Sequence, residues 1–155
     1  MAQADTRNDP DTASIEAIVA CMYEVLSGPP GERDWARLRK LYLDQARLIP
    51  TGMRPGGSQG LNLFSVDAYV EDVRPHFLST GFFEREAARR IERYGDIAHV
   101  FSTYESRHRA DDAQPFLRGI NSIQLLRKDQ RWWVVNVMWQ NESADAPIPP
   151  AYLPA

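Results

Sequence analysis

The chain has 155 residues and a mass of 17.7 kDa, with 43% hydrophobic and 25% charged residues, which fits one globular domain and excludes two large ones. Its 18 basic and 21 acidic side chains give a net charge of -3, which excludes the basic surplus typical of nucleic-acid-binding proteins. The single cysteine, Cys21, cannot form an internal disulfide, and the first ten residues lack a secretory signal, so we expect a cytoplasmic protein.

Two helices are predicted at the start of the domain. Apolar residues at helical spacing predict the first over 15–26, and the Gly28-Pro29-Pro30 stretch that follows cannot continue it. Asp34 offers an N-cap for a shorter helix over 35–42, where apolar residues again share one face.

A strand, a loop and a third helix follow. The strand is expected over 46–50, and the glycine-rich composition of 51–60 favours an irregular loop at the rim of a pocket rather than a phosphate-binding loop. Ser65 predicts the N-cap of the third helix. Pro75 has no backbone donor, so we expect this helix to kink or end near Arg74.

The C-terminal half is predicted to be an antiparallel meander. Residues 82–94 fit a helix by local propensity and a long strand by alternation, and both alternatives stay open at this point. A period of two then predicts three strands, over 96–109, 115–127 and 131–142. Helices followed by strands indicate the α+β class.

Three regions are expected along the chain. Residues 1–12 are predicted to be a flexible N-terminus and residues 13–143 to form the folded domain. Residues 144–155 contain four prolines, which favour an extended tail on the surface.

Two motifs give the first resemblance to a known family. The sequence Gly95-Asp96-Ile97-Ala98 and the run 131–135, Arg-Trp-Trp-Val-Val, which leads to Trp139, resemble the nuclear transport factor 2-like superfamily over Ser14–Glu142. The resemblance implies a cystatin-like cone, in which a strongly bent antiparallel sheet wraps three N-terminal helices around an internal pocket. It also implies that residues 82–94 form a strand. The same cone serves ketosteroid isomerases, polyketide cyclases, dehydratases and association domains.

The ketosteroid isomerase pattern is only partly present. Tyr23 matches the tyrosine on the first helix, but Ile49 occupies the position of the catalytic carboxylate before Pro50. The position of the third catalytic group falls on Asn121 or Ser122, neither of which is an acid. The chain therefore resembles the fold without the isomerase's chemistry.

A set of six residues is expected to line the pocket. His99 is either a general base or a hydrogen-bonded structural histidine, and Tyr23 either faces the pocket or belongs to the core. The spacing of the histidines fits no metal site, and neither a metal nor a cofactor is expected. The pocket candidates are Tyr23, His99, Phe101, Asn121, Val137 and Trp139.

Both faces of the last strand are largely apolar, and the helices can cover only one of them. We therefore expect the outer face to be covered by a second copy of the chain. The interface candidates are Trp132, Val134, Asn136 and Met138, with Trp133, Val135, Val137 and Trp139 on the opposite face.

Three functions stay open. The first is a homodimeric protein whose apolar pocket binds a small hydrophobic molecule, with no assignable catalysis. The second is a cofactor-free isomerase, cyclase or dehydratase that uses His99 as base and Tyr23 as hydrogen-bond donor. The third is an association module without catalysis.

Overall fold

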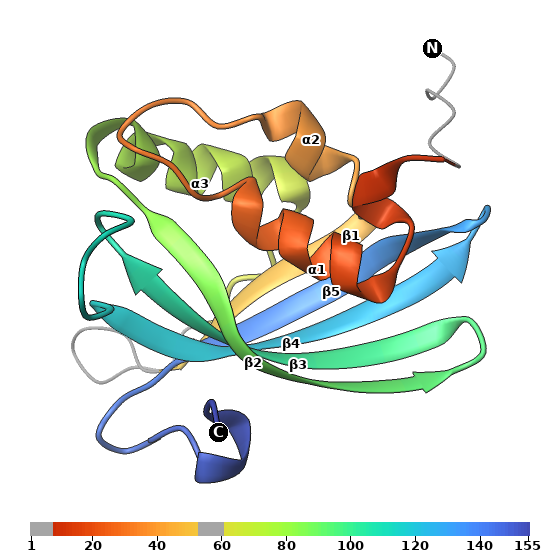
Figure 1. Cartoon of the computed structure of the whole chain (residues 1–155). Helices are drawn as coiled ribbons and strands as arrows, with labels where there is room; N and C mark the ends of the chain where they lie inside the picture. Colours follow the sequence, from red (N-terminus) through yellow and green to blue (C-terminus); the bar gives the residue numbers. More distant parts are fainter. Residues whose placement is uncertain (1–7, 53–60) are drawn as a thin grey trace.

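Three helices lie on the concave face of a curved five-stranded sheet (Figure 1). The structure is a computed structural model and describes residues 8–52 and 61–155. The elements in chain order are α1 (Ile15–Glu24), α2 (Trp35–Arg39), β1 (Tyr42–Thr51), α3 (Val66–Ser79), β2 (Phe83–Tyr94), β3 (Ile97–Arg107), β4 (Leu117–Lys128) and β5 (Arg131–Asn141). Two short 3-10 turns are also present, at Pro10–Thr12 and Pro150–Tyr152. No helix in this described part is long and apolar enough to cross a bilayer.

The sheet has the strand order β1-β5-β4-β3-β2. Strands β2 to β5 form the predicted antiparallel meander, and β1 adds to β5 in a parallel orientation, so the sheet is mixed. Residues 83–94 form a strand because β2 pairs with β3 along its whole length, which overrides the local preference for helix.

The predicted caps Asp34 and Ser65 begin α2 and α3, and Ser14 caps α1. The hydroxyls of Ser14 and Ser65 and the carboxylate of Asp34 each accept a hydrogen bond from a backbone amide in the first turn. The helix α3 does not end near Arg74, one of the two predicted outcomes, because it continues through Pro75 to Ser79.

Phe77 accounts for this continuation of α3. Its side chain is buried, and its ring stacks on that of Trp35, with 6.3 Å between the centroids. The packing of this last turn offsets the hydrogen bond that the proline cannot donate.

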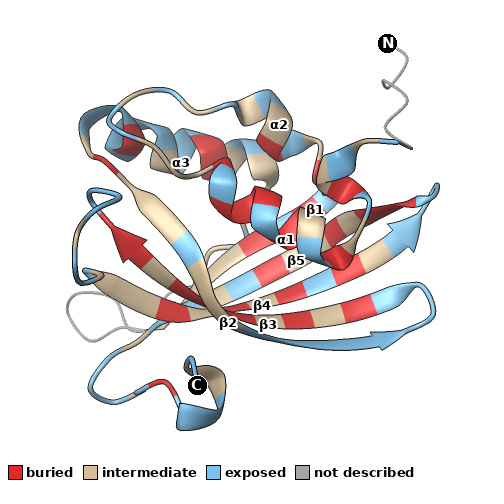
Figure 2. Cartoon of the chain, in the orientation of Figure 1, coloured by how far each residue is buried: buried red, intermediate tan, exposed pale blue. Residues whose placement is uncertain are grey.

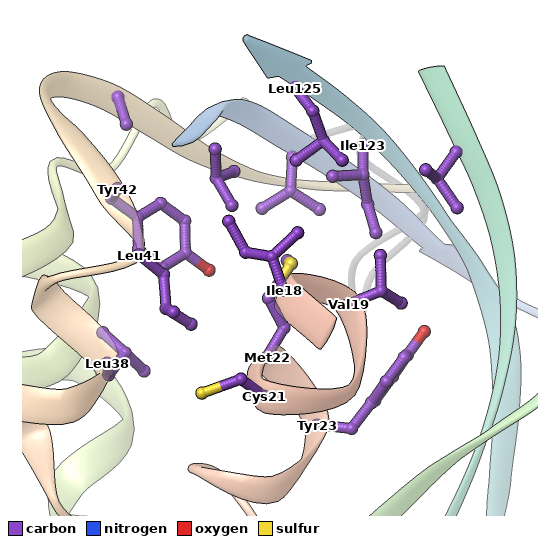
Figure 3. Packing of buried hydrophobic residues seen from close by; sticks show 14 of the residues in the cluster. Ile18, Val19, Cys21, Met22, Tyr23, Leu38, Leu41, Tyr42, Ile123 and Leu125 are labelled. Carbon is purple, nitrogen blue, oxygen red and sulfur yellow. The ribbon is translucent and has the colours of Figure 1, made fainter. Parts of the chain in front are cut away.

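The core lies between the helices and the concave face of the sheet. Buried residues gather on the inner side of α1 and at alternate positions of the strands, whereas the hairpin joining β2 to β3 is exposed (Figure 2). Figure 3 shows Ile18 of α1 facing Ile123 and Leu125 of β4. Each of these three side chains is at most 2% exposed.

A β-bulge in β5 corrects the predicted faces of this strand. Gln124 pairs with Asn136 and Leu125 with Val134, so Val135 is an extra residue without an opposite partner. The side chains of Trp132 and Val134 are 3% and 0% exposed and belong to the core. After the bulge, Val137 is the buried residue and Met138 is exposed. The strict alternation predicted for β5 is therefore wrong.

Both ends of the described chain are held more tightly than predicted. Asp9 accepts a hydrogen bond from Lys40, and Asp11 pairs with Arg37, so the segment 9–12 is anchored beside α2. The predicted flexible N-terminus otherwise falls on residues 1–7, outside the described part, as does most of the glycine-rich loop.

The C-terminal tail is also packed rather than merely extended. Ile148 is buried, and Tyr152 lies against the convex face of the sheet, with its ring edge-on to Phe101.

Candidate functional site

A cavity of about 240 Å³ lies between the helices and the concave face of the sheet. We call it the inner cavity. Most of its wall is apolar or aromatic, and its polar groups come from α1, α3 and all five strands. The residues that line it are Met22, Tyr23, Leu26, Tyr42, Leu48, Tyr69, Val73, His76, Phe77, Phe82, Glu84, Tyr104, Leu117, Asn121, Val137, Trp139 and Asn141.

Among the residues that the structure describes, Glu84 supplies the only carboxylate in this wall. Its Oε2 accepts one hydrogen bond from the hydroxyl of Ser106, at 3.0 Å, on the facing strand β3. Burial raises the pKa of Glu84 to about 7, although the hydrogen bond from Ser106 acts in the opposite direction. A carboxyl group with this pKa can accept and return a proton near neutral pH.

The backbone of Glu84 is fastened to the end of α1. The hydroxyl of Ser27 accepts from the Glu84 amide at 2.9 Å and lies 3.1 Å from the Glu84 carbonyl oxygen. The same hydroxyl is 2.8 Å from the carbonyl of Tyr23, and Gly28 and Phe82 pair through two backbone hydrogen bonds. These contacts hold the start of β2, and therefore the carboxyl of Glu84, against the helix.

Two tyrosine hydroxyls in the wall lack a hydrogen-bond partner within the described residues. Tyr42 and Tyr69 are 7% and 8% exposed, and the hydroxyl oxygen of each keeps some accessible surface. In Figure 3 the Tyr42 oxygen points into the interior beside Ile18. Burial raises the pKa of both phenols, and the charge of Glu84 raises them further. Both therefore stay protonated and can donate to a bound oxygen atom.

The hydroxyl of Tyr23 is already committed to a buried network. It lies 2.6 Å from the hydroxyl of Ser102 and accepts from Asn121 at 3.0 Å. Because Ser102 donates its single proton to the Glu86 carboxylate, Tyr23 must donate to Ser102. Tyr23 therefore has no proton left for a ligand in this arrangement, which argues against its predicted role as a donor to substrate.

The six pocket candidates are divided between the two faces of the sheet. Tyr23, Asn121, Val137 and Trp139 line the inner cavity. His99 and Phe101 lie on the convex face, where the His99 ring bonds to the hydroxyl of Ser122 and Phe101 packs on the C-terminal tail. The prediction that they face the pocket is wrong, and a base at His99 acting with Tyr23 is excluded by their opposite faces.

The four interface candidates are divided in the same way. Trp132 and Val134 are core residues and are not available to a second copy, whereas Met138 is 44% exposed and Asn136 is half-buried on the convex face. Burial raises the pKa of the Cys21 thiol to about 12, which makes it a poor nucleophile. In residues 8–52 and 61–155 no group of three or more metal-ligating side chains comes together.

Sequence reasoning missed Glu84, Tyr42 and Tyr69. Glu84 lies in a charged stretch that resembles a solvated face, and Tyr42 was assigned to the apolar stripe of a helix. A signal was available in the alternation of Ser102, Tyr104 and Ser106, which places polar groups on one face of β3.

The comparisons with known proteins place the fold. No protein-family model matches the chain, and no curated protein matches it by sequence. Among solved structures, 111 chains match. A protein of unknown function with a cystatin-like fold from Nostoc punctiforme has a TM-score of 0.64 at 11% identity, over 84% of this chain and 90% of that one.

Two further solved structures show the same similarity. A nuclear transport factor 2-like protein of unknown function from Pseudomonas putida has a TM-score of 0.60 at 14% identity, over 81% of this chain and 82% of that one. A candidate ketosteroid isomerase from Shewanella frigidimarina has a TM-score of 0.56 at 17% identity, over 84% and 97%. The chain therefore has the nuclear transport factor 2-like, or cystatin-like, cone fold.

Proposed function

We propose that the inner cavity binds a small, mainly apolar molecule and that Glu84 transfers a proton on it. The observation that carries this proposal is the Glu84 carboxyl, which lies in a largely apolar wall with a single hydrogen bond from Ser106. Burial brings its pKa to about 7, where the carboxylate is both populated and basic enough to act.

Tyr42 and Tyr69 supply the second part of this chemistry. The carboxylate of Glu84 takes a proton from a carbon next to a carbonyl group, and the electron pair of the broken C–H bond moves onto the carbonyl oxygen. Their hydroxyls, which have no partner in residues 8–52 and 61–155, can donate hydrogen bonds to this oxygen as its negative charge develops. Return of the proton from Glu84 to another carbon completes an isomerisation. The step needs no oxidant or reductant.

The proton transfer can be tested without knowing the natural substrate. The probe 5-nitrobenzisoxazole opens when a base removes its carbon-bound proton: the nitrogen–oxygen bond breaks, and a nitrile and a coloured phenolate form. We expect the rate to rise with pH around a midpoint near 7, the pKa of Glu84. Glu84→Gln should reduce the rate by at least ~10²-fold, since general base catalysis contributes that much.

A matched control is Glu92→Gln, which removes the same charge from an exposed position of the same strand. Its rate should equal that of the wild type. A Glu84→Gln variant as fast as the wild type, or a wild-type rate no higher than that of buffer, would exclude Glu84 as the base.

We also propose that the chain forms a homodimer, through a smaller part of the convex face than the four predicted residues define. The exposed surface of the convex face includes Met138, which is 44% exposed at the edge of the C-terminal tail, and the half-buried Asn136 beside it. An exposed methionine on a sheet face supports contact with a second copy.

A further inference from the structure

A second cavity lies on the other side of the sheet, between the convex face and the C-terminal tail. We call it the tail hollow, and its volume is about 400 Å³. Its floor comes from β3, β4 and β5 and its roof from residues 146–152. The apolar side chains that define it are Phe101, Ile120, Met138, Pro147, Ile148 and Tyr152.

The roof of the tail hollow is anchored at its first end by Ile148. This side chain is buried, and its amide donates to Oε2 of Glu142 at 2.9 Å. The Glu142 carboxylate is itself held by Arg118 on β4, at 2.8 Å. The tail is therefore attached to the sheet just after it leaves β5.

Tyr152 anchors the second end of the roof. Its carbonyl accepts from the Thr103 hydroxyl at 2.6 Å, and its ring lies edge-on to Phe101, with 5.1 Å between centroids. The guanidinium of Arg90 lies 5.3 Å from the same ring. Between the two anchors, Pro149 and Pro150 fix the backbone, so the roof cannot easily collapse onto the floor.

The hydroxyl and charged groups at the edge of the tail hollow are already paired. The Thr51 hydroxyl donates to the carbonyl of Trp139 at 2.9 Å, and the Ser122 hydroxyl bonds to His99 at 3.0 Å. Glu142 is neutralised by Arg118. The space therefore offers apolar contact without a free charge, which favours a neutral occupant, and its volume is within the range of small-molecule pockets, roughly 300–1,000 Å³.

We propose that the tail hollow is a second binding site, which takes a neutral aromatic or aliphatic molecule of about two or three rings between the sheet and the tail. The rings of Phe101 and Tyr152 contact its faces and edges, and Ile120 and Met138 form the floor beneath it. The site is separate from the inner cavity, although Trp139 and Asn141 line both.

The test uses the neutral fluorescent probe N-phenyl-1-naphthylamine and measures the number of molecules bound per chain. Ile120→Trp fills the tail hollow from its floor, and Val73→Trp fills the inner cavity from α3 as the matched control. We expect Ile120→Trp to remove one bound probe molecule and Val73→Trp to leave that molecule in place. This result supports the tail hollow whether or not the inner cavity binds the same probe.

A folded Ile120→Trp variant that binds as much probe as the wild type would overturn the proposal, as would a wild-type chain that binds none. Circular dichroism establishes that each variant is folded. If Ile120→Trp does not fold, Tyr152→Ala removes a roof contact at the surface and should weaken the same binding at least tenfold, and an unchanged affinity would overturn the proposal. Loss of probe in Val73→Trp alone would refute the tail hollow and leave the inner cavity standing.

Discussion

Replacing Glu84 by Gln should stabilise the protein at neutral pH and leave its stability at acid pH unchanged. Burial raises the pKa of this carboxyl from 4.5 to about 7, so the folded chain holds the proton to higher pH than the unfolded chain does. The contribution of Glu84 to stability is therefore greatest below about pH 4.5 and decreases as the pH rises to about 7. Glutamine has the same shape and can still accept from Ser106, but it does not ionise.

The size of the effect follows from the pKa. A rise from 4.5 to about 7 corresponds to about 3 kcal/mol, at 1.36 kcal/mol per unit. Because the inner cavity opens to solvent, some water reaches the ionised carboxylate and reduces this cost. We therefore expect the free energy of unfolding of Glu84→Gln to exceed that of the wild type by about 2 kcal/mol at about pH 8. At about pH 4 the two values should be equal.

Urea unfolding of the two proteins across this range measures the difference directly. Other titrating groups contribute equally to both curves and cancel. The exposed Glu92→Gln variant controls for the loss of one negative charge. If the free energy of unfolding changed with pH in the same way for wild type and Glu84→Gln, the reasoning would be refuted. The carboxyl of Glu84 would then have the same pKa in the folded and unfolded chains.

Four other substitutions test the remaining contacts. Tyr23→Phe leaves the buried Asn121 amide without its acceptor and takes one hydrogen bond from Ser102, so it should cost about 1–3 kcal/mol in urea unfolding, and an unchanged midpoint would contradict the network. At Gly119 a methyl group would meet the Tyr104 hydroxyl and the backbone carbonyl oxygen of Gln140, so Gly119→Ala should lower the melting temperature, whereas equal melting would mean that both the tyrosine and strand β5 move freely. Met138→Glu should give monomers in sedimentation velocity. Trp132→Glu should prevent folding, because Trp132 is in the core. A folded, monomeric Trp132→Glu variant would instead place Trp132 on the outer face of the sheet, as the sequence predicted.

The sequence predicts most of the elements because their signals are local. Asp34 and Ser65 mark the starts of α2 and α3, and alternation marks β3 and β4 with ends close to those observed. The strand at 83–94 could not be chosen from its own residues, since only its pairing with β3 decides against helix. The resemblance to the cone fold supplied that missing tertiary information.

The faces of the strands were harder to predict than the strands themselves. Alternation places His99 and Ser102 on opposite faces of β3. It does not indicate which of these residues points toward the helices. In β5, the extra residue Val135 changes the face midway, and nothing in a run of apolar side chains marks the position of a bulge.

Glu84 was missed for a related reason. Its charged neighbours suggest an exposed strand, and only the register with β3 brings Ser106 opposite the carboxyl and α1 above it.

The parallel pairing of β1 with β5 affects the order in which the chain folds during synthesis. The hairpins from β2 to β5 join segments close in sequence, whereas Tyr42 and Val134 meet from positions about ninety residues apart. Long-range pairing of this kind forms slowly and late. During synthesis, β1 has no edge to join until β5 has left the ribosome. Tyr42 and Leu48, which line the inner cavity from β1, therefore take their places last, and the site does not exist in any nascent chain that stops short of β5.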